Sequence, residues 1–151
     1  SRCQLNGAVS VLGQTIQSLC TGELKQNLLM GRFDFTEEDY FQVIEAKTAS
    51  LFGCSCQLGA MVSGVSDVQS REMYEFGFLF GLVFQIADDL KDRDALVKNG
   101  VDLVPLAKIY AQKAKSDLAP FNDVPAKTSL MRLCDILLPA GNSPGIFDTN
   151  E

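Results

Sequence analysis

The sequence predicts an all-α protein, and three observations point to that class. Apolar residues recur with helical spacing along most of the 151-residue chain, no segment alternates in the manner of a strand, and only five prolines interrupt the pattern. A hydrophobic content of 46% over this length is sufficient for one domain with a substantial core. We therefore expect a single helical domain over residues 1–138. Residues 139–151 contain turn residues without periodicity, which predicts a flexible C-terminal tail.

Composition argues against several classes of function. The formal charge of −6 and the lack of a basic stripe argue against nucleic acid as a partner, because phosphate backbones are bound by clustered lysine and arginine. The longest apolar run is too short to span a bilayer and no signal peptide opens the chain, so we expect no transmembrane segment. The sequence has no histidine, which removes most serine–histidine and cysteine–histidine nucleophile schemes. Any chemistry must therefore depend on metal, lysine and carboxylates, or proceed without a covalent step.

The five cysteines indicate a reducing environment. Their number is odd and their spacing does not suggest a disulfide framework, so we expect the thiols to be core packing and the protein to be cytoplasmic.

The first predicted helix covers about residues 5–30. Its apolar residues recur every three or four positions, which predicts a stripe that faces the core. This stripe consists of Leu5, Ala8, Leu12, Ile16 and Leu19. Continuing it leads to Glu23 and Gln26. Two interpretations of this polar pair stay open: the helix end turns toward solvent, or the pair belongs to a functional site.

The second predicted helix begins with clear capping signals. Thr36 is the expected N-cap, and Asp39 three residues later completes a capping box. The helix is expected to continue to about residue 63 and to end at Gly64. Its inward row contains Tyr40, Ile44, Lys47, Leu51 and Cys54. The lysine in this row either extends past its neighbours to water or points into a cavity, where its ammonium would meet an anion such as a diphosphate.

The stretch GFLFGLVFQIADDLKD, residues 77–92, is the most informative part of the chain. As a helix it is apolar around most of its circumference and is therefore expected to be buried. Gln85, Asp88, Asp89 and Asp92 fall at i, i+3, i+4 and i+7, which predicts one polar stripe. Three neighbouring carboxylates repel one another, so the stripe is either a solvated acidic helix end or a site that holds a cation. The apolar residues before it and the glutamine one turn earlier favour the cation. Oxygen ligands without histidine favour a hard cation, and Mg²⁺ is the one that we expect.

Glycines and capping residues complete the predicted helices. Gly77 and Gly81 lie on one line of their helix, where a neighbouring helix can approach closely. Asp102 is expected to cap a further helix with Pro105 in its first turn, and a last short helix is expected over about residues 126–138.

Four motifs in order resemble the trans-isoprenyl diphosphate synthases, the polyprenyl synthetase family, over the C-terminal two thirds of a family member. The motifs are GELKQ at residues 22–26, AKTASLF at 46–52, LGAMVSG at 58–64 and the stretch 77–92, which is similar to the family's second aspartate-rich motif. The resemblance implies an isoprenoid synthase-type helical bundle around a central cavity, incomplete in this chain. It also implies Mg²⁺-dependent condensation of isopentenyl diphosphate with an allylic diphosphate, which yields a trans-polyprenyl diphosphate.

The resemblance also implies roles for individual residues. Those with implied catalytic roles are Lys47, Thr48 and Gln85. Those implied to bind substrate are Lys47, Gln85, Gln26 and, less closely matched, Glu23. Those implied to bind Mg²⁺ are Asp88, Asp89 and Asp92. Family members are generally dimers, so we expect a homodimer, with a heteromer as the alternative.

The chain departs from the family pattern in two respects. The family's first aspartate-rich motif is not in this sequence, because the acidic residues 37–39 are explained as a helix start. Lys91 occupies a position inside DDxxD that is more usually apolar. Either the sequence lacks the loops and helices of a longer enzyme, or the protein is a shortened homologue. The alternative functions are a noncatalytic partner or regulatory subunit of a heteromeric prenyl diphosphate synthase and, less well supported by the motifs, a terpene cyclase.

Overall fold

The computed structural model describes residues 2–30, 34–92 and 102–138, and helices are the only regular structure in these ranges. They are α1 (Arg2–Leu29), α2 (Glu37–Ile44), the π-helix η1 (Glu45–Ala49), α3 (Ser50–Val62), α4 (Asp67–Asp92), α6 (Val104–Asp117) and α7 (Pro125–Ile136). The predicted all-α class is confirmed. The predicted tail over residues 139–151 lies outside the described residues.

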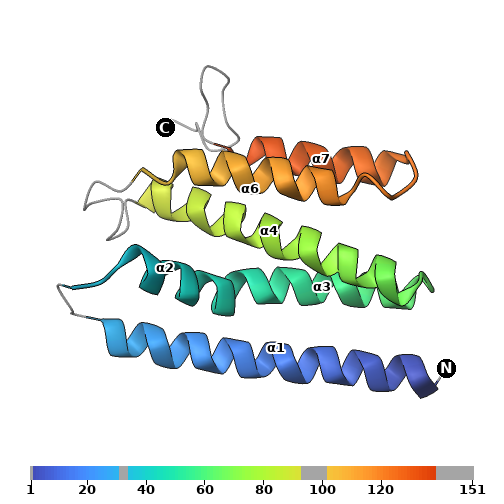
Figure 1. Cartoon of the computed structure of the whole chain (residues 1–151), viewed down its shortest axis with the longest axis horizontal. Helices are drawn as coiled ribbons and strands as arrows, with labels where there is room; N and C mark the ends of the chain where they lie inside the picture. The colour runs from blue at the N-terminus through green and yellow to red at the C-terminus, as the bar shows by residue number, and fades with distance from the viewer. Residues whose placement is uncertain (1, 31–33, 93–101, 139–151) are drawn as a thin grey trace, which may run out of the picture.

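Successive helices run in alternating directions and lie side by side (Figure 1). Helix α1 borders the continuous helix formed by α2, η1 and α3, which borders α4, and α6 and α7 lie on the far side of α4. Helix α4 packs mainly against α3 and α6 and is therefore central. The end of α1, the start of α2 and the end of α4 gather at one end of the bundle, on the left in Figure 1.

Side-chain caps determine where α2 and α4 begin. The Thr36 hydroxyl accepts a hydrogen bond from the Asp39 N–H at 3.1 Å, and the Asp39 carboxylate accepts one from the Thr36 N–H at 3.3 Å, so the predicted capping box is confirmed. Ser66 and Gln69 form the same reciprocal arrangement before α4, with both bonds at 3.2 Å. Gly64, with φ +80°, follows the end of α3 in the left-handed conformation that glycine adopts most readily.

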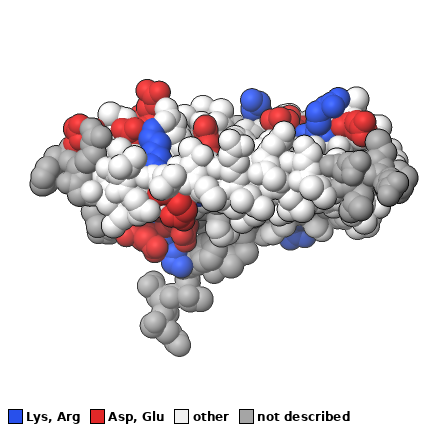
Figure 2. All heavy atoms as spheres, turned by 90° about the horizontal axis from the view of Figure 1, so that it is seen from below, with Lys and Arg blue, Asp and Glu red and all other residues white. Residues whose placement is uncertain are grey.

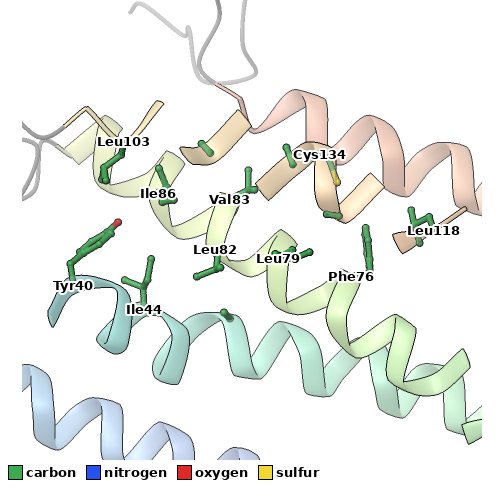
Figure 3. Close-up of a cluster of buried hydrophobic side chains, with 14 residues drawn as sticks. Tyr40, Ile44, Phe76, Leu79, Leu82, Val83, Ile86, Leu103, Leu118 and Cys134 are labelled. Carbon is green, nitrogen blue, oxygen red and sulfur yellow. The ribbon is translucent and has the colours of Figure 1, made fainter. Parts of the chain in front are cut away.

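The core lies on both sides of α4, which confirms the prediction of a buried helix (Figure 3). Phe76, Val83 and Ile86 of α4 are fully buried, and burying each such side chain stabilises the fold by about 1.5–3 kcal/mol. In Figure 3, side chains of α2 approach α4 from one side and side chains from α7 and the ends of α6 approach it from the other. Among the described residues, no helix combines the length and hydrophobicity that a membrane span requires.

Gly77 and Gly81 allow α3 and α4 to lie in close contact, as predicted. A Cβ atom on Gly77 would lie 2.5 Å from the carbonyl oxygen of Phe52, and one on Gly81 would lie 2.8 Å from the Cα atom of Ala49. Both distances are well inside van der Waals contact. The two backbones therefore approach along a line where only glycine fits.

Helix α1 packs against the bundle through a different face from the one predicted. The predicted core stripe is wrong, because Leu12 and Ile16 are 45% and 58% exposed. The face that packs against α3 and η1 instead contains small residues such as the buried Thr15 and Gly22. Small side chains let the helices approach closely, so the longer apolar side chains remain on the outer face.

Candidate functional site

The π-helix η1 places two of the predicted site residues, Lys47 and Thr48. Core residues of an α-helix recur after three or four positions, but here the buried Ala49 follows the buried Ile44 after five. The wider turn accommodates one extra residue, and the apolar row beyond it is displaced. Leu51, predicted to face inward, is therefore 48% exposed. Single π turns inside α-helices occur frequently at functional sites.

Helix α1 contacts Lys47 through the motif GELKQ. Gly22 leaves room for the lysine stem, since a Cβ atom there would lie 2.7 Å from Lys47 Cγ and 2.9 Å from Ala46 Cβ. The ammonium lies 2.8 Å from Glu23 Oε1 and donates a hydrogen bond to Gln26 Oε1 at 2.5 Å. The polar pair at the end of α1 therefore belongs to the environment of Lys47. Because the lysine and the glutamate are both partly exposed, their ion pair is worth only about 0–1 kcal/mol, and an anion could replace Glu23.

A chain of hydrogen bonds connects η1 with α4 and α2. The Thr48 hydroxyl donates to Gln85 Oε1 at 2.7 Å, and Gln85 Nε2 donates to Asp89 Oδ1 at 2.9 Å. The buried Tyr40 hydroxyl donates to the other oxygen, Asp89 Oδ2. Sequence reasoning identified Thr48, Gln85 and Asp89 but treated Tyr40 as a core residue. The available signal was a tyrosine in an apolar row, because a buried phenol usually requires a polar partner.

The three aspartates of α4 do not form one open stripe. Asp88 and Asp92 are exposed and lie one turn apart, whereas Asp89 is only 7% exposed and faces α2. Within the described ranges, no group of three acidic, cysteine or histidine side chains is arranged to bind a metal ion. Two exposed carboxylates about 5–6 Å apart at their Cβ atoms nevertheless fit Mg²⁺, which typically takes one or two carboxylates together with phosphate oxygens and waters.

Carboxylates also lie on the side of η1 that faces α6. Burial raises the pKa of the Glu45 carboxyl. Burial, followed by the negative charges of Glu45 and Glu37, raises the pKa of Tyr110 on α6. The π-helix thus presents an ammonium toward α1 and a partly buried carboxylate near α6.

Comparison with known proteins identifies the family of the chain. The family model described as polyprenyl synthetase matches residues 2–103, which include every predicted site residue. The chain belongs to the polyprenyl synthetase family. The resemblance carried by the four motifs is confirmed.

Individual relatives match part of their own length. Component 2 of the heptaprenyl diphosphate synthase of Geobacillus stearothermophilus is 41% identical over 85 residues, which cover 56% of this chain and 27% of that protein. The chloroplastic solanesyl-diphosphate synthase 2 of Oryza sativa subsp. japonica is 34% identical over 114 residues, which cover 76% of this chain and 26% of the relative. The chain therefore spans about a quarter of the length of these proteins.

Solved structures show the fold. A geranylgeranyl pyrophosphate synthetase from Geoglobus acetivorans matches with a TM-score of 0.79 and 21% identity, covering 91% of this chain and 59% of that one. A polyprenyl synthase from Caulobacter crescentus CB15, complexed with calcium and isoprenyl diphosphate, matches with a TM-score of 0.78 and 24% identity, covering 89% of this chain and 58% of that one. The described helices thus have the all-helical prenyl synthase fold over part of its length.

Proposed function

We propose that the chain is part of a Mg²⁺-dependent trans-prenyltransferase that condenses isopentenyl diphosphate with an allylic diphosphate. The observation that carries the proposal is the hydrogen-bonded chain from Thr48 through Gln85 to Asp89, which joins the residue next to Lys47 to the aspartates of α4. Family membership supports the same conclusion.

Lys47 is the residue that we assign to the allylic diphosphate. Negative charge accumulates on the departing diphosphate as the allylic C–O bond breaks, and a fixed ammonium stabilises that charge. Glu23 would repel a diphosphate, so its contact with Lys47 supports a role in orienting the lysine rather than in binding substrate. Gln26 can also orient the lysine, because its amide oxygen accepts a hydrogen bond from the ammonium.

Asp88 and Asp92 are the residues that we assign to Mg²⁺, because they are exposed at the end of α4. Bound Mg²⁺ would neutralise diphosphate charge that the lysine does not reach. The buried Asp89 would contribute indirectly, by orienting the Gln85 amide through their hydrogen bond. Thr48 and Gln85, which are hydrogen-bonded to each other, would form the polar surface next to the reacting carbon.

Aromatic side chains adjoin this polar group and suit an isoprenoid. Phe52 of α3 packs against Phe80 and Phe84 of α4, with ring centroids 5.5 and 5.2 Å apart. Phe84 immediately precedes Gln85 and is partly exposed. Apolar walls of this kind exclude water, which would otherwise react with an allylic carbocation.

Elongation assays with labelled isopentenyl diphosphate and an allylic primer test the proposal. We expect Mg²⁺-dependent product from the complete protein and a loss of about 10²–10³-fold in kcat for Lys47→Ala, as for other deleted charge-stabilising donors. Lys108→Ala, on an exposed position of α6, is the matched control. If no product formed and the protein associated tightly with a second synthase chain, the proposal of an enzyme would be refuted. The alternative of a noncatalytic subunit would then be favoured.

The outer face of α1 supports the proposed homodimer. A band of uncharged residues runs along the middle of the face in Figure 2, with charged residues at its edges. Val9, Leu12 and Ile16 of α1 are exposed. Exposed apolar patches commonly mark interfaces between proteins. Sedimentation of the complete protein, compared with Leu12→Glu, tests this assignment, and a monomeric wild type would refute it. Heteromeric assembly and cytoplasmic location stay predictions.

A further inference from the structure

Tyr40 connects the core of the bundle to the aspartates at the end of α4. Its ring is buried between α2 and α4, beside Ile86 and Leu103 in Figure 3, and its hydroxyl donates to Asp89 Oδ2. A buried hydroxyl generally requires a hydrogen-bond partner. Here that partner is a carboxylate of the DDxxD motif, so the residue is more than an apolar contact.

Asp89 accepts hydrogen bonds at both carboxylate oxygens. Tyr40 donates to Oδ2, and Gln85 Nε2 donates to Oδ1 at 2.9 Å. A buried carboxylate depends on such donors, because leaving one unpaired is strongly destabilising. An ionised carboxylate can only accept, so Asp89 determines which end of the Gln85 amide faces it. The amide oxygen of Gln85 is thereby left to accept from Thr48 at 2.7 Å.

We propose that Tyr40 is a positioning residue of the diphosphate site, an inference that rests on the proposed function. The Tyr40 hydroxyl fixes the Asp89 carboxylate, the carboxylate fixes the Gln85 amide, and the amide fixes Thr48 next to Lys47. Without the hydroxyl, Asp89 loses this donor at Oδ2, which weakens the constraint on the orientation of its carboxylate. Gln85 then loses the contact that selects its orientation.

The first test reads the Gln85 amide directly, in the complete chain without metal. Tyr40→Phe keeps the ring and its packing, and Tyr74→Phe removes a hydroxyl from another tyrosine, on α4. We expect the side-chain amide NMR signals of Gln85, identified by their loss in Gln85→Glu, to shift in Tyr40→Phe and to stay in place in Tyr74→Phe. Unchanged signals in Tyr40→Phe would overturn the proposal.

The second test measures calorimetric binding of inorganic pyrophosphate with Mg²⁺. We expect Tyr40→Phe to weaken binding about tenfold, the effect of losing one hydrogen bond to a charged group, and Tyr74→Phe to leave it unchanged. In an Asp89→Asn background, adding Tyr40→Phe should have little further effect, because the hydroxyl acts through the carboxylate. An equal loss in both backgrounds would indicate a merely structural role and overturn the proposal.

The two proposals fail in different ways. A wild-type chain that does not bind pyrophosphate would refute the proposed function and this inference with it. Wild-type binding that Tyr40→Phe leaves unchanged would refute the inference alone.

Discussion

Replacing Gly77 by alanine should destabilise the protein even though alanine favours helices. The new Cβ atom would lie 2.5 Å from the Phe52 carbonyl oxygen and 2.8 Å from Cys56 Sγ. The backbone oxygen cannot rotate away, so α3 and α4 must separate. Overpacking of this kind costs about 1–3 kcal/mol, and the backbone contact places Gly77→Ala at the upper end of that range. The gain in helix propensity offsets about 1 kcal/mol, which leaves a net loss of about 1–2 kcal/mol.

Gly59→Ala is the matched control for this prediction. Gly59 also lies inside a helix, but a Cβ atom there meets nothing within 4 Å. The substitution should therefore raise the free energy of unfolding by about 1 kcal/mol through propensity alone. The two variants, identical in chemistry, should differ by about 2–3 kcal/mol.

Urea unfolding followed by far-ultraviolet circular dichroism measures both variants. At this chain length the expected loss in Gly77→Ala corresponds to a fall in Tm of about 2–8 °C. A Gly77→Ala protein as stable as Gly59→Ala would refute the reasoning, since it would show that α3 and α4 can separate without cost.

Four further predictions use the same preparations. Thr36→Ala removes the capping box of α2 and should lower the free energy of unfolding by about 1 kcal/mol in urea; no change would show that the cap is not formed. Leu118→Ala should cost about 2–5 kcal/mol because its side chain is fully buried, and a smaller loss would mean that the site collapses around the cavity. Burial raises the pKa of the Cys134 thiol to about 11, so iodoacetamide at about pH 8 should modify the exposed Cys20 and spare Cys134 until the protein unfolds, as peptide mass spectrometry would show. The folded state retains this proton after the unfolded thiol has lost it, so stability should also fall as the pH rises from about 9 toward 11.

Features determined by local sequence were predictable. The capping box at Thr36 and Asp39 depends only on residues three positions apart, and Gly64 requires only a left-handed turn. The burial of α4 was also predictable, because a helix that is apolar on most sides can be stabilised only between other helices.

Features that depend on how the helices pack against one another were not predictable from the sequence. On α1, the stripe through Leu12 and Ile16 and the face through Thr15 and Gly22 are both consistent with a helix, and hydrophobicity favours the wrong one. The short distance between α1 and η1 decides which face of α1 is buried, because a residue without a side chain, Gly22, is needed against Lys47. For the same reason the sequence identified Lys47 as a site residue but left open whether its ammonium faced water or a cavity.

The π turn of η1 shows how contacts with other helices override local preference. Residues 45–49, EAKTA, contain good helix formers, and nothing in them requires a departure from α geometry. Their contacts require it, since Ala49 lies against Gly81 of α4 while Lys47 meets α1 and Thr48 bonds to Gln85. In an uninterrupted α-helix the residue one turn after Ile44 would be Lys47 or Thr48 rather than Ala49, and the close approach at Gly81 has little space for either side chain. The extra residue in η1 therefore keeps a small residue opposite Gly81, and it presents Lys47 and Thr48 to two different neighbouring helices.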